Sequence, residues 1–518
     1  MLKLDYWAQS DSLNMLQYQP QISEIHKKLN TKQDAYTGWV DWPLRVEPAL
    51  IQEILDTAEE IRQKCTALVV IGIGGSYLGA KGMAKQILSS LLPEIGPMDE
   101  LVERAYTGKF ESEELTPTVK VGGFTVLELF RGPTSAFKDV ALCMLPQLLT
   151  AAKASEGMAE EILILTATSG DTGKAALAGF ADVPGVGICV FYPHGGVSAV
   201  QRAQMVTQKG GNVRVCAVEG NFDDAQTGVK NIFAACADGK LLEGRGIELS
   251  SANSINIGRL APQITYYFKA YADLMARGEI SLGDKVNFCV PTGNFGDILA
   301  GYLAKKLGLP VGRLICASNT NKVLADFIHT GTYDRKRPLH KTDSPSMDIL
   351  VSSNLERLLY LLSGQNAELV AGLMKQLNTE GKYTVPTELK AAIEAEFWGD
   401  FAGDAETSAT IDKVWKNHGY LCDTHTAVGW YVAENYVNQT GDRTPMVVLS
   451  TASPYKFPAA VLSAIGGDTS GDEFQQMERL SAITKVPIPG NLTGLRELPE
   501  LHTGVIAKEK MLSFVLNK

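Results

Sequence analysis

Short apolar runs of strand length alternate with amphipathic segments along most of this 518-residue chain. Most of the runs end in Gly, Ser, Thr or Asn and lead directly into a stretch with helical spacing. This order predicts an α/β fold in which mostly parallel sheets are covered by helices on both faces. Because ligands bind such sheets at the carboxyl ends of strands, the loops after the runs are the candidates for a site. The runs lie at 67–75, 161–170, 186–193, 212–220, 285–296, 312–319 and 445–453.

The composition narrows the class of protein further. Hydrophobic residues make up 45% of the chain and charged residues 20%, which is typical of a globular protein. The net charge of -10 argues against a nucleic-acid partner, because an acidic surface repels a phosphate backbone. No stretch approaches the roughly 18 apolar residues of a membrane span, and the first residues lack the pattern of a secretory signal. We therefore expect a soluble cytoplasmic protein without a membrane partner.

The cysteines and histidines give no sign of a disulfide frame or a metal site. None of the cysteines falls in a C-x-x-C pair, which fits reduced thiols in a core. Cys422 and His425 form a lone C-x-x-H, a pattern that is more often structural than half of a zinc site. We therefore expect no metal. The eight cysteines are Cys65, Cys143, Cys189, Cys216, Cys236, Cys289, Cys316 and Cys422.

Three stretches bear on domain organisation. The Pro- and Gly-containing segment 91–100 is interpreted as a boundary after an N-terminal block. The polar stretch 331–346 is interpreted as a surface loop. A segment rich in Glu and Ala over 388–406 predicts a helix.

One lysine stands in an apolar context. Lys138 lies near the start of a predicted helix of mostly apolar residues, between Phe137 and Val140. Burial there would lower the pKa of the amine, and a neutral amine is what reaction with an aldehyde requires. A lysine whose stem lies along the surface with its ammonium in water explains the segment as well, and from this segment alone it is the favoured interpretation.

Two glycine-containing loops after strands could hold an anion at a helix start. The loop 168–173 precedes Lys174, but it is not a P-loop, because Thr168 and Ala175 replace the required Gly and Ser or Thr. The loop 291–297 places glycines on both sides of Asn294 and Phe295, so several amides could converge on one phosphate. An ordinary strand-to-helix turn explains the second loop equally well.

Three further segments leave alternatives open. The loop 71–76 could also hold a phosphate, although it is out of register with a dinucleotide-binding G-x-G-x-x-G. The polar cluster 253–256 is either a helix cap or part of a site, and capping is favoured. The segment 451–454 follows a strand-like run and is either a turn or the source of a hydroxyl for a pyridine nitrogen.

Taken together and in order, several motifs resemble the threonine synthase family over about residues 83–518. The resemblance implies a fold-type-II pyridoxal-phosphate enzyme, similar to the tryptophan synthase beta chain, with mostly parallel sheets in two subdomains. The implied reaction converts O-phospho-L-homoserine and water to L-threonine and phosphate. The alternatives are another fold-type-II eliminase, such as a threonine or serine dehydratase, and a catalytically impaired chimera. The motifs are LELFRGPTSAFKD, TATSGDTG, SAVQRAQM, SSANSIN, VPTGNFGDILAGYLAKKLGLP and LSTASPYKF.

The same resemblance assigns roles to residues of the site. Lys138 would hold pyridoxal 5'-phosphate as a Schiff base and act as a base on the substrate. Thr451 would face the pyridine nitrogen, and Asp171 stands where related enzymes place an Asn against the ring hydroxyl. The cofactor phosphate would be bound by Gly293, Asn294, Phe295, Gly296 and Asp297, and the substrate carboxylate by Thr168, Ser169, Asp171 and Thr172.

Some positions are less certain or depart from the family pattern. The substrate phosphate could be bound by Lys174, Arg202 or Arg259 on family position. The family usually has His at the positions of Arg131 and Ser453. It usually has Ala at the position of Tyr455.

The N-terminal segment resembles a different family. Residues 37–82 are similar to the start of glucose-6-phosphate isomerase, whose GIGGS loop helps to bind the sugar phosphate. The base and ring-opening residues of that family have no counterpart in this chain. We therefore expect two parts, an α/β fragment over 1–82 and a catalytic region over 83–518, fused near residues 79–85.

Overall fold

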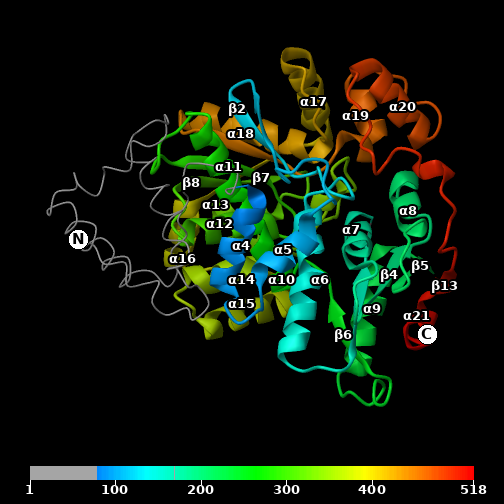
Figure 1. Cartoon of the computed structure of the whole chain (residues 1–518). Coiled ribbons are helices and arrows are strands. Elements are labelled where there is room, and N and C mark those ends of the chain that lie inside the picture. The colour runs from blue at the N-terminus through cyan, green and yellow to red at the C-terminus, as the bar shows by residue number, and fades with distance from the viewer. Residues whose placement is uncertain (1–78, 169, 518) are drawn as a thin grey trace, which may run out of the picture. The chain divides into compact units, whose positions relative to one another are not determined.

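The computed structural model describes residues 79–168 and 170–517. The chain divides into two units, residues 1–68 and 69–518, and all of the described residues belong to the second unit. The predicted strand at 67–75, the loop 71–76 and nearly all of the isomerase-like segment therefore lie outside the described residues. Figure 1 shows the described part as two groups of strands with helices packed around them.

The larger sheet has six strands in the order β1-β2-β12-β7-β8-β11. The first two strands form an antiparallel hairpin, and the other neighbouring pairs are parallel. The central strand β12 is buried along its whole length, which explains its continuous apolar sequence. The strands are β1 (Thr118–Val121), β2 (Phe124–Glu128), β12 (Met446–Ser450), β7 (Val286–Pro291), β8 (Val311–Ser318) and β11 (Phe397–Phe401).

The second sheet has five parallel strands in the order β13-β5-β4-β3-β6. Each predicted run from 161–170 onward forms a strand in one of the two sheets, so the prediction of mostly parallel sheets is confirmed. A small antiparallel pair, β9 (Thr332–Asp334) with β10 (Lys382–Thr384), stands apart from both. The strands of the second sheet are β3 (Glu161–Ala167), β4 (Val186–Pro193), β5 (Val213–Glu219), β6 (Ile247–Ser251) and β13 (Val505–Ala507).

Helices cover both faces of each sheet. Helix α6 contributes to two hydrophobic cores. Val140 and Met144 pack in one of them, and Leu142 and Leu145 pack in the other. None of the described helices is both long enough and apolar enough to cross a membrane. The helices are α4 (Ala80–Leu91), α5 (Met98–Tyr106), α6 (Lys138–Ser155), α7 (Asp171–Phe180), α8 (Ala199–Val206), α9 (Phe222–Cys236), α10 (Ile257–Leu260), α11 (Ile264–Ala276), α12 (Gly296–Lys306), α13 (Val323–Thr330), α14 (Leu355–Leu362), α15 (Ala367–Glu380), α16 (Thr387–Glu396), α17 (Asp404–His418), α18 (Thr424–Thr440), α19 (Pro458–Ala464), α20 (Glu473–Thr484) and α21 (Met511–Leu516).

The prediction of a helix over 388–406 is wrong in its middle. Residues Phe397–Phe401 form β11, which pairs in parallel with β8 at the edge of the larger sheet. Within this strand Phe397 and Gly399 are buried. A Cβ on Gly399 would lie 3.0 Å from the Cα of Ala325, so glycine lets α13 pack closely on the strand. The strand therefore interrupts the expected helix at its aromatic and glycine residues, where the chain pairs with β8.

The boundary expected at 91–100 does not separate two units of the chain. The segment 91–100 connects α4 to α5, and both helices contribute to one hydrophobic core. The division expected at 82/83 falls within α4 and stays a prediction, because most of residues 1–82 lie outside the described residues. The stretch 331–346 is only partly a surface loop, since it contains β9 and the buried Ser344.

Candidate active site

Three neighbouring strands bring the predicted cofactor residues to one edge of the larger sheet. β12 lies between β2 and β7 and is parallel to both, with strands about 4.8 Å apart. The chain leaves β2 toward Lys138, leaves β12 at Thr451, and leaves β7 toward Gly293. Because all three exits are carboxyl ends, these residues converge at the same edge.

Backbone hydrogen bonds join the lysine segment to the end of β12. The N–H of Phe137 donates to the carbonyl of Thr451 at 2.8 Å, and the N–H of Ser453 donates to the carbonyl of Ser135 at 3.1 Å. The carboxylate of Asp139, on α6, accepts the N–H of Thr134 at 2.9 Å. The turn before α6 is therefore fixed on both sides, and Lys138 begins the helix in a set position.

The amine of Lys138 is buried. The residue is 8% exposed, and its Nζ lies 3.7 Å from Oδ2 of Asp171 and 4.9 Å from the ring centroid of Phe137. Burial lowers the pKa of this amine to about 8, against the opposing attraction of Asp171. The positive charges of Lys456 and Arg259 lower the pKa of Lys138 further. The amine is therefore buried rather than at the surface, and it gives up its proton more readily than an ordinary lysine.

Two consecutive tyrosines of α11 link the lysine to the glycine loop. The hydroxyl of Tyr266 donates to the carbonyl of Phe137 at 2.6 Å. The hydroxyl of Tyr267 donates to the carbonyl of Asp297 at 2.7 Å. One rigid helix therefore positions both the start of α6 and the start of α12.

The loop 293–297 presents unpaired amides. The N–H groups of residues 293–296 donate no hydrogen bond within the described part of the chain, and they stand at the start of α12. Phe295 has φ +62°, and its buried ring packs on Phe397, so it offers the loop its backbone alone. A Cβ on Gly293 would lie 2.5 Å from the carbonyl oxygen of Ser346. Clustered amides at a helix start fit a phosphate group.

A buried histidine supports this loop from behind. Nδ1 of His425 lies 2.7 Å from the carboxylate of Asp423, which can only accept, so Nδ1 carries the proton. Nε2 of His425 then accepts the N–H of Ser346 at 3.1 Å. His425 therefore holds the residue whose carbonyl faces Gly293. The only signal for this role in the sequence is a histidine at a helix start.

The loop after β3 lies beside the lysine. The hydroxyl oxygen of Thr168 accepts the N–H groups of Gly170 and Gly173, each at 2.9 Å, which orders the start of α7. Asp171 is the first residue of that helix and reaches Lys138. Thr172 is half-buried, and Ser169 lies outside the described residues. The structure thus brings Thr168 and Asp171 together with Lys138.

A second buried lysine was missed by the sequence analysis. Lys456 has a fully buried side chain, and its Nζ lies 2.6 Å from Oδ1 of Asp171. It also donates to the carbonyl of Thr134 at 3.1 Å. The side chain of Ser453 caps the short 3-10 helix Pro454–Lys456 that positions this lysine. The only sequence signal was a lysine soon after a buried strand.

The three basic candidates for an anion site differ in environment. Arg259 is 3% exposed, donates to the carbonyl of Ala252 at 3.0 Å, and forms no ion pair within the described residues. Burial lowers its pKa to about 10. Lys174 donates to Gln208, and burial lowers its pKa to about 8. Arg202 instead forms a surface ion pair with Glu500. Arg259 and Lys174 both lack a carboxylate partner among the described residues, and Arg259 is the more deeply buried of the two.

The three departures from the family pattern have structural partners. Arg131 pairs with Glu128 at 2.6 Å and Glu111 at 3.3 Å. The Ser453 side chain accepts the N–H of Tyr455 at 3.3 Å. The Tyr455 hydroxyl donates to a backbone carbonyl, that of residue 486. Each of the three side chains that depart from the family pattern therefore has a polar partner.

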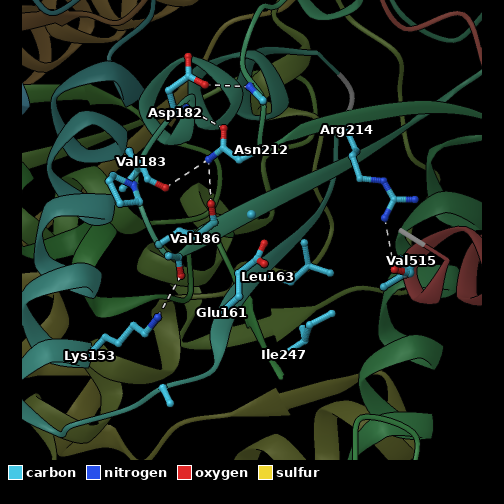
Figure 2. Close-up of a pocket in the computed structure, with 15 residues that line it drawn as sticks. Lys153, Glu161, Leu163, Asp182, Val183, Val186, Asn212, Arg214, Ile247 and Val515 are labelled. Carbon is cyan, nitrogen blue, oxygen red and sulfur yellow. Dashed lines mark hydrogen bonds between the residues drawn. The ribbon is translucent and has the colours of Figure 1, made fainter. Parts of the chain in front are cut away.

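A cavity of about 710 Å³ lies at the edge of the second sheet where its strands begin. It is lined by the amino ends of β3, β4, β5 and β6, whereas Thr168 and Asp171 follow the carboxyl end of β3. Figure 2 shows that polar side chains lining the cavity donate to backbone carbonyls of other residues that line it. Asn212 donates to the carbonyl of Val186 at 2.8 Å. Arg214 donates to the carbonyl of Val515 at 3.3 Å. This cavity is separate from the site around Lys138.

Comparisons with known proteins agree with this arrangement. The family described as "Pyridoxal-phosphate dependent enzyme" matches residues 104–452, and the family "Threonine synthase, C-terminal" matches residues 426–510. Threonine synthase of Pseudomonas aeruginosa is 43% identical over 74% of this chain and 80% of its own length. The chain belongs to the threonine synthase family. The cofactor of the wider matched family is pyridoxal phosphate.

Solved structures of family members have the same fold. A crystal structure of PLP-bound threonine synthase from Brucella melitensis superposes with a TM-score of 0.74 at 38% identity, over 85% of this chain and 87% of that one. Yeast threonine synthase gives a TM-score of 0.74 at 33% identity, over 87% and 92%. The fold-type-II prediction is therefore confirmed.

Some relatives are much longer than the matched region. "Threonine synthase-like 1" of Macaca fascicularis is 41% identical over 71% of this chain, but the match spans 50% of its length. The chain spans about half the length of such curated relatives.

Proposed function

We propose that this chain is a pyridoxal-phosphate-dependent threonine synthase that converts O-phospho-L-homoserine and water to L-threonine and phosphate. The observation that carries the proposal is the buried amine of Lys138 at the edge where β2, β12 and β7 end. Lys138 would bind the cofactor aldehyde, and the amides of residues 293–296 its phosphate. Thr451, whose hydroxyl has no hydrogen-bond partner among the described residues, would face the pyridine nitrogen.

Lys138 is suited to move protons at the substrate. When bound, the cofactor supplies an electron sink that makes the substrate Cα–H acidic. With a pKa of about 8, the Lys138 amine is partly neutral near neutral pH and can accept that proton. Across the whole reaction Cβ loses a proton, the Cγ–O bond to phosphate breaks, the hydroxyl of water adds at Cβ, and Cγ gains a proton. The remaining proton of water leaves with the phosphate.

The loop after β3 would bind the substrate carboxylate. Amides at the start of α7 suit an anion, and the hydroxyl of Thr168 already orders them. Ser169 and Thr172 would add hydroxyl donors. The carboxylate of Asp171 is compatible with an anionic substrate because Lys456 lies 2.6 Å away and offsets its charge.

Arg259 is the favoured group for the substrate phosphate. A buried guanidinium without a carboxylate partner costs free energy that a bound anion would offset. The charge of Arg259 also acts on Lys138, which indicates that it belongs to the same site. Lys174 is the second candidate, whereas Arg202 already pairs with Glu500 at the surface.

The test is release of phosphate and threonine from O-phosphohomoserine by wild type, Lys138→Ala and Lys153→Ala. Lys153 is a matched control, because it lies in the last turn of the same helix α6. We expect activity in wild type and Lys153→Ala and none in Lys138→Ala. Equal rates in all three would remove the role of Lys138. Ammonia release from threonine or serine without phosphate release would favour a dehydratase, and cofactor absorbance without turnover would favour an impaired chimera.

We also propose that the isomerase-like residues 1–82 form a fused segment without isomerase activity and that the protein is cytoplasmic. The support is the missing isomerase base in the sequence and the seven described cysteines, all of which are buried and form no disulfide with one another. A coupled assay that detects fructose-6-phosphate turnover would overturn the first statement. Cell fractionation with a specific antibody tests the second.

A further inference from the structure

One carboxylate in the candidate site lies between two buried lysines. Oδ1 of Asp171 is 2.6 Å from Nζ of Lys456, and Oδ2 is 3.7 Å from Nζ of Lys138. The shorter contact is a hydrogen-bonded ion pair, whereas the longer one exceeds hydrogen-bond distance. The side chain of Gln201 also donates to Oδ1 at 3.0 Å. Asp171 is therefore engaged mainly by Lys456.

Lys456 has no access to water. Its side chain is fully buried, and it donates to the carbonyl of Thr134 in addition to Asp171. The Ser453 cap fixes the 3-10 helix that carries it. A buried ammonium needs a partner to stay charged, and Asp171 is the one carboxylate it contacts among the described residues.

The charges within this group balance in one arrangement. If Lys456 is charged, Asp171 is ionised and Lys138 is neutral, the buried group carries no net charge. If Lys456 were absent, Asp171 would have only Lys138 to serve as its counter-ion. Lys138 would then be held as an ammonium, which cannot attack an aldehyde.

We propose that Lys456 is a positioning residue that serves as the permanent counter-ion of Asp171 and so leaves Lys138 free as a neutral amine. This inference rests on the proposed role of Lys138 in binding the cofactor. Lys456 itself is not expected to touch the substrate or take up a proton during turnover.

The electrostatics of the surrounding elements point the same way. Burial alone would raise the pKa of Asp171, but Lys456 and then Lys138 lower that pKa below its ordinary value. The charged groups that act on Lys138 are Asp171 of α7, Lys456, Arg259 of α10 and Asp139 of α6 itself. Lys456 lowers the pKa of Lys138, whereas Asp171 raises it. Removing Lys456 should therefore raise the pKa of Lys138, and removing Asp171 should lower it.

The experiment measures how fast cofactor-free, full-length protein regains visible absorbance when pyridoxal phosphate is added between pH 6.5 and 10. Only the neutral amine reacts, so the rate of wild type rises with pH around a midpoint near the Lys138 pKa of about 8. Lys456→Met should raise the midpoint by about one pH unit, and Asp171→Asn should lower it by a similar amount. The double variant Asp171→Asn/Lys456→Met should return to within about half a unit of wild type.

A surface pair of the same chemistry is the control. Lys416 of α17 is 67% exposed and lies 2.7 Å from Asp412. Lys416→Met should leave the midpoint unchanged, because exposed pairs are screened by water. A loss of packing alone would lower the rate at every pH without moving the midpoint.

Each outcome decides the proposal. Single variants that leave the midpoint in place, or that move it in the same direction, overturn it. If Lys456→Met does not fold but the double variant does, the result supports a charge role; if neither folds, the proposal is overturned. Absence of cofactor capture by wild type overturns both this inference and the proposed function, whereas normal capture without phosphate release overturns the proposed function alone.

Discussion

The carbonyl oxygen of Ser346 lies 2.5 Å from the point that a Cβ atom on Gly293 would occupy. Ser346 cannot retreat freely, because its own N–H donates to His425. The backbone of Gly293 is therefore pressed against a fixed neighbour, and the loop that offers unpaired amides depends on the absence of a side chain at this position.

Gly293→Ala should weaken cofactor binding, because the new methyl group must displace either Ser346 or the loop. Overpacking of this kind costs about 1–3 kcal/mol. The measurement is the dissociation constant of pyridoxal phosphate by fluorescence titration. Gly372→Ala is the matched control: Gly372 lies inside α15 with nothing within 4 Å of its ideal Cβ, so that variant should bind the cofactor normally. Equal affinities for both variants would contradict the role of Gly293.

His425→Ala should weaken the same loop from behind. It removes the acceptor of the Ser346 N–H and one donor to Asp423, at a cost of about 1–3 kcal/mol in the free energy of unfolding. His425→Gln can keep an acceptor near the position of Nε2, so it should lose less cofactor affinity than His425→Ala. Urea denaturation and cofactor titration measure the two effects, with exposed His340→Ala as the control. Alanine and glutamine variants of equal affinity would argue against the hydrogen bond to Ser346.

Lys138→Met should stabilise the cofactor-free protein while abolishing cofactor linkage. The pKa of Lys138 falls from an ordinary 10.5 to about 8 because of burial, so the folded state binds fewer protons than the unfolded chain between these values. Wild-type stability should therefore rise as pH increases through this window. The advantage of Lys138→Met should reach at most about 3 kcal/mol below pH 8 and vanish above pH 10.5. Denaturant unfolding at pH 7 and pH 10.5 tests this; a difference independent of pH would contradict it.

The strands could be predicted because buried parallel strands have continuous apolar sequences. β4 and β12 are buried at every position, and local sequence is enough to identify them. β11 was missed because Glu- and Ala-containing helical segments flank it on both sides, whereas its own residues Phe397–Phe401 pair with the distant strand β8. Local propensity yields where a tertiary contact decides the structure.

The residues of the candidate site likewise differ in whether their local sequence identifies them. Lys138 and the glycine loop stand out in the sequence by residue type and place after a strand, but only the family resemblance gave them a role over a surface lysine and an ordinary turn. Lys456 and His425 could not, since their partners Asp171 and Ser346 lie far away in the chain. Residues that act by holding another residue have no local pattern, and they emerge only when the fold brings distant segments together.

Asp297→Asn tests how ionisation of Asp297, at the start of α12, affects the stability of the protein. Burial raises the pKa of Asp297 to about 7, even though the hydroxyl of Tyr267 donates to Oδ1 at 3.1 Å and lowers it. The folded state therefore binds more protons than the unfolded chain between the ordinary value of 3.8 and about 7. Stability should fall as pH rises through this window, because the carboxylate must ionise without a buried cation. Asparagine keeps the Oδ1 acceptor and removes the charge, so Asp297→Asn should be more stable than wild type at pH 8, by up to about 4 kcal/mol, and equal to it near pH 4. Thermal unfolding of cofactor-free protein at the two pH values gives the answer, and a variant less stable than wild type at pH 8 would show that the ionised carboxylate has a favourable partner.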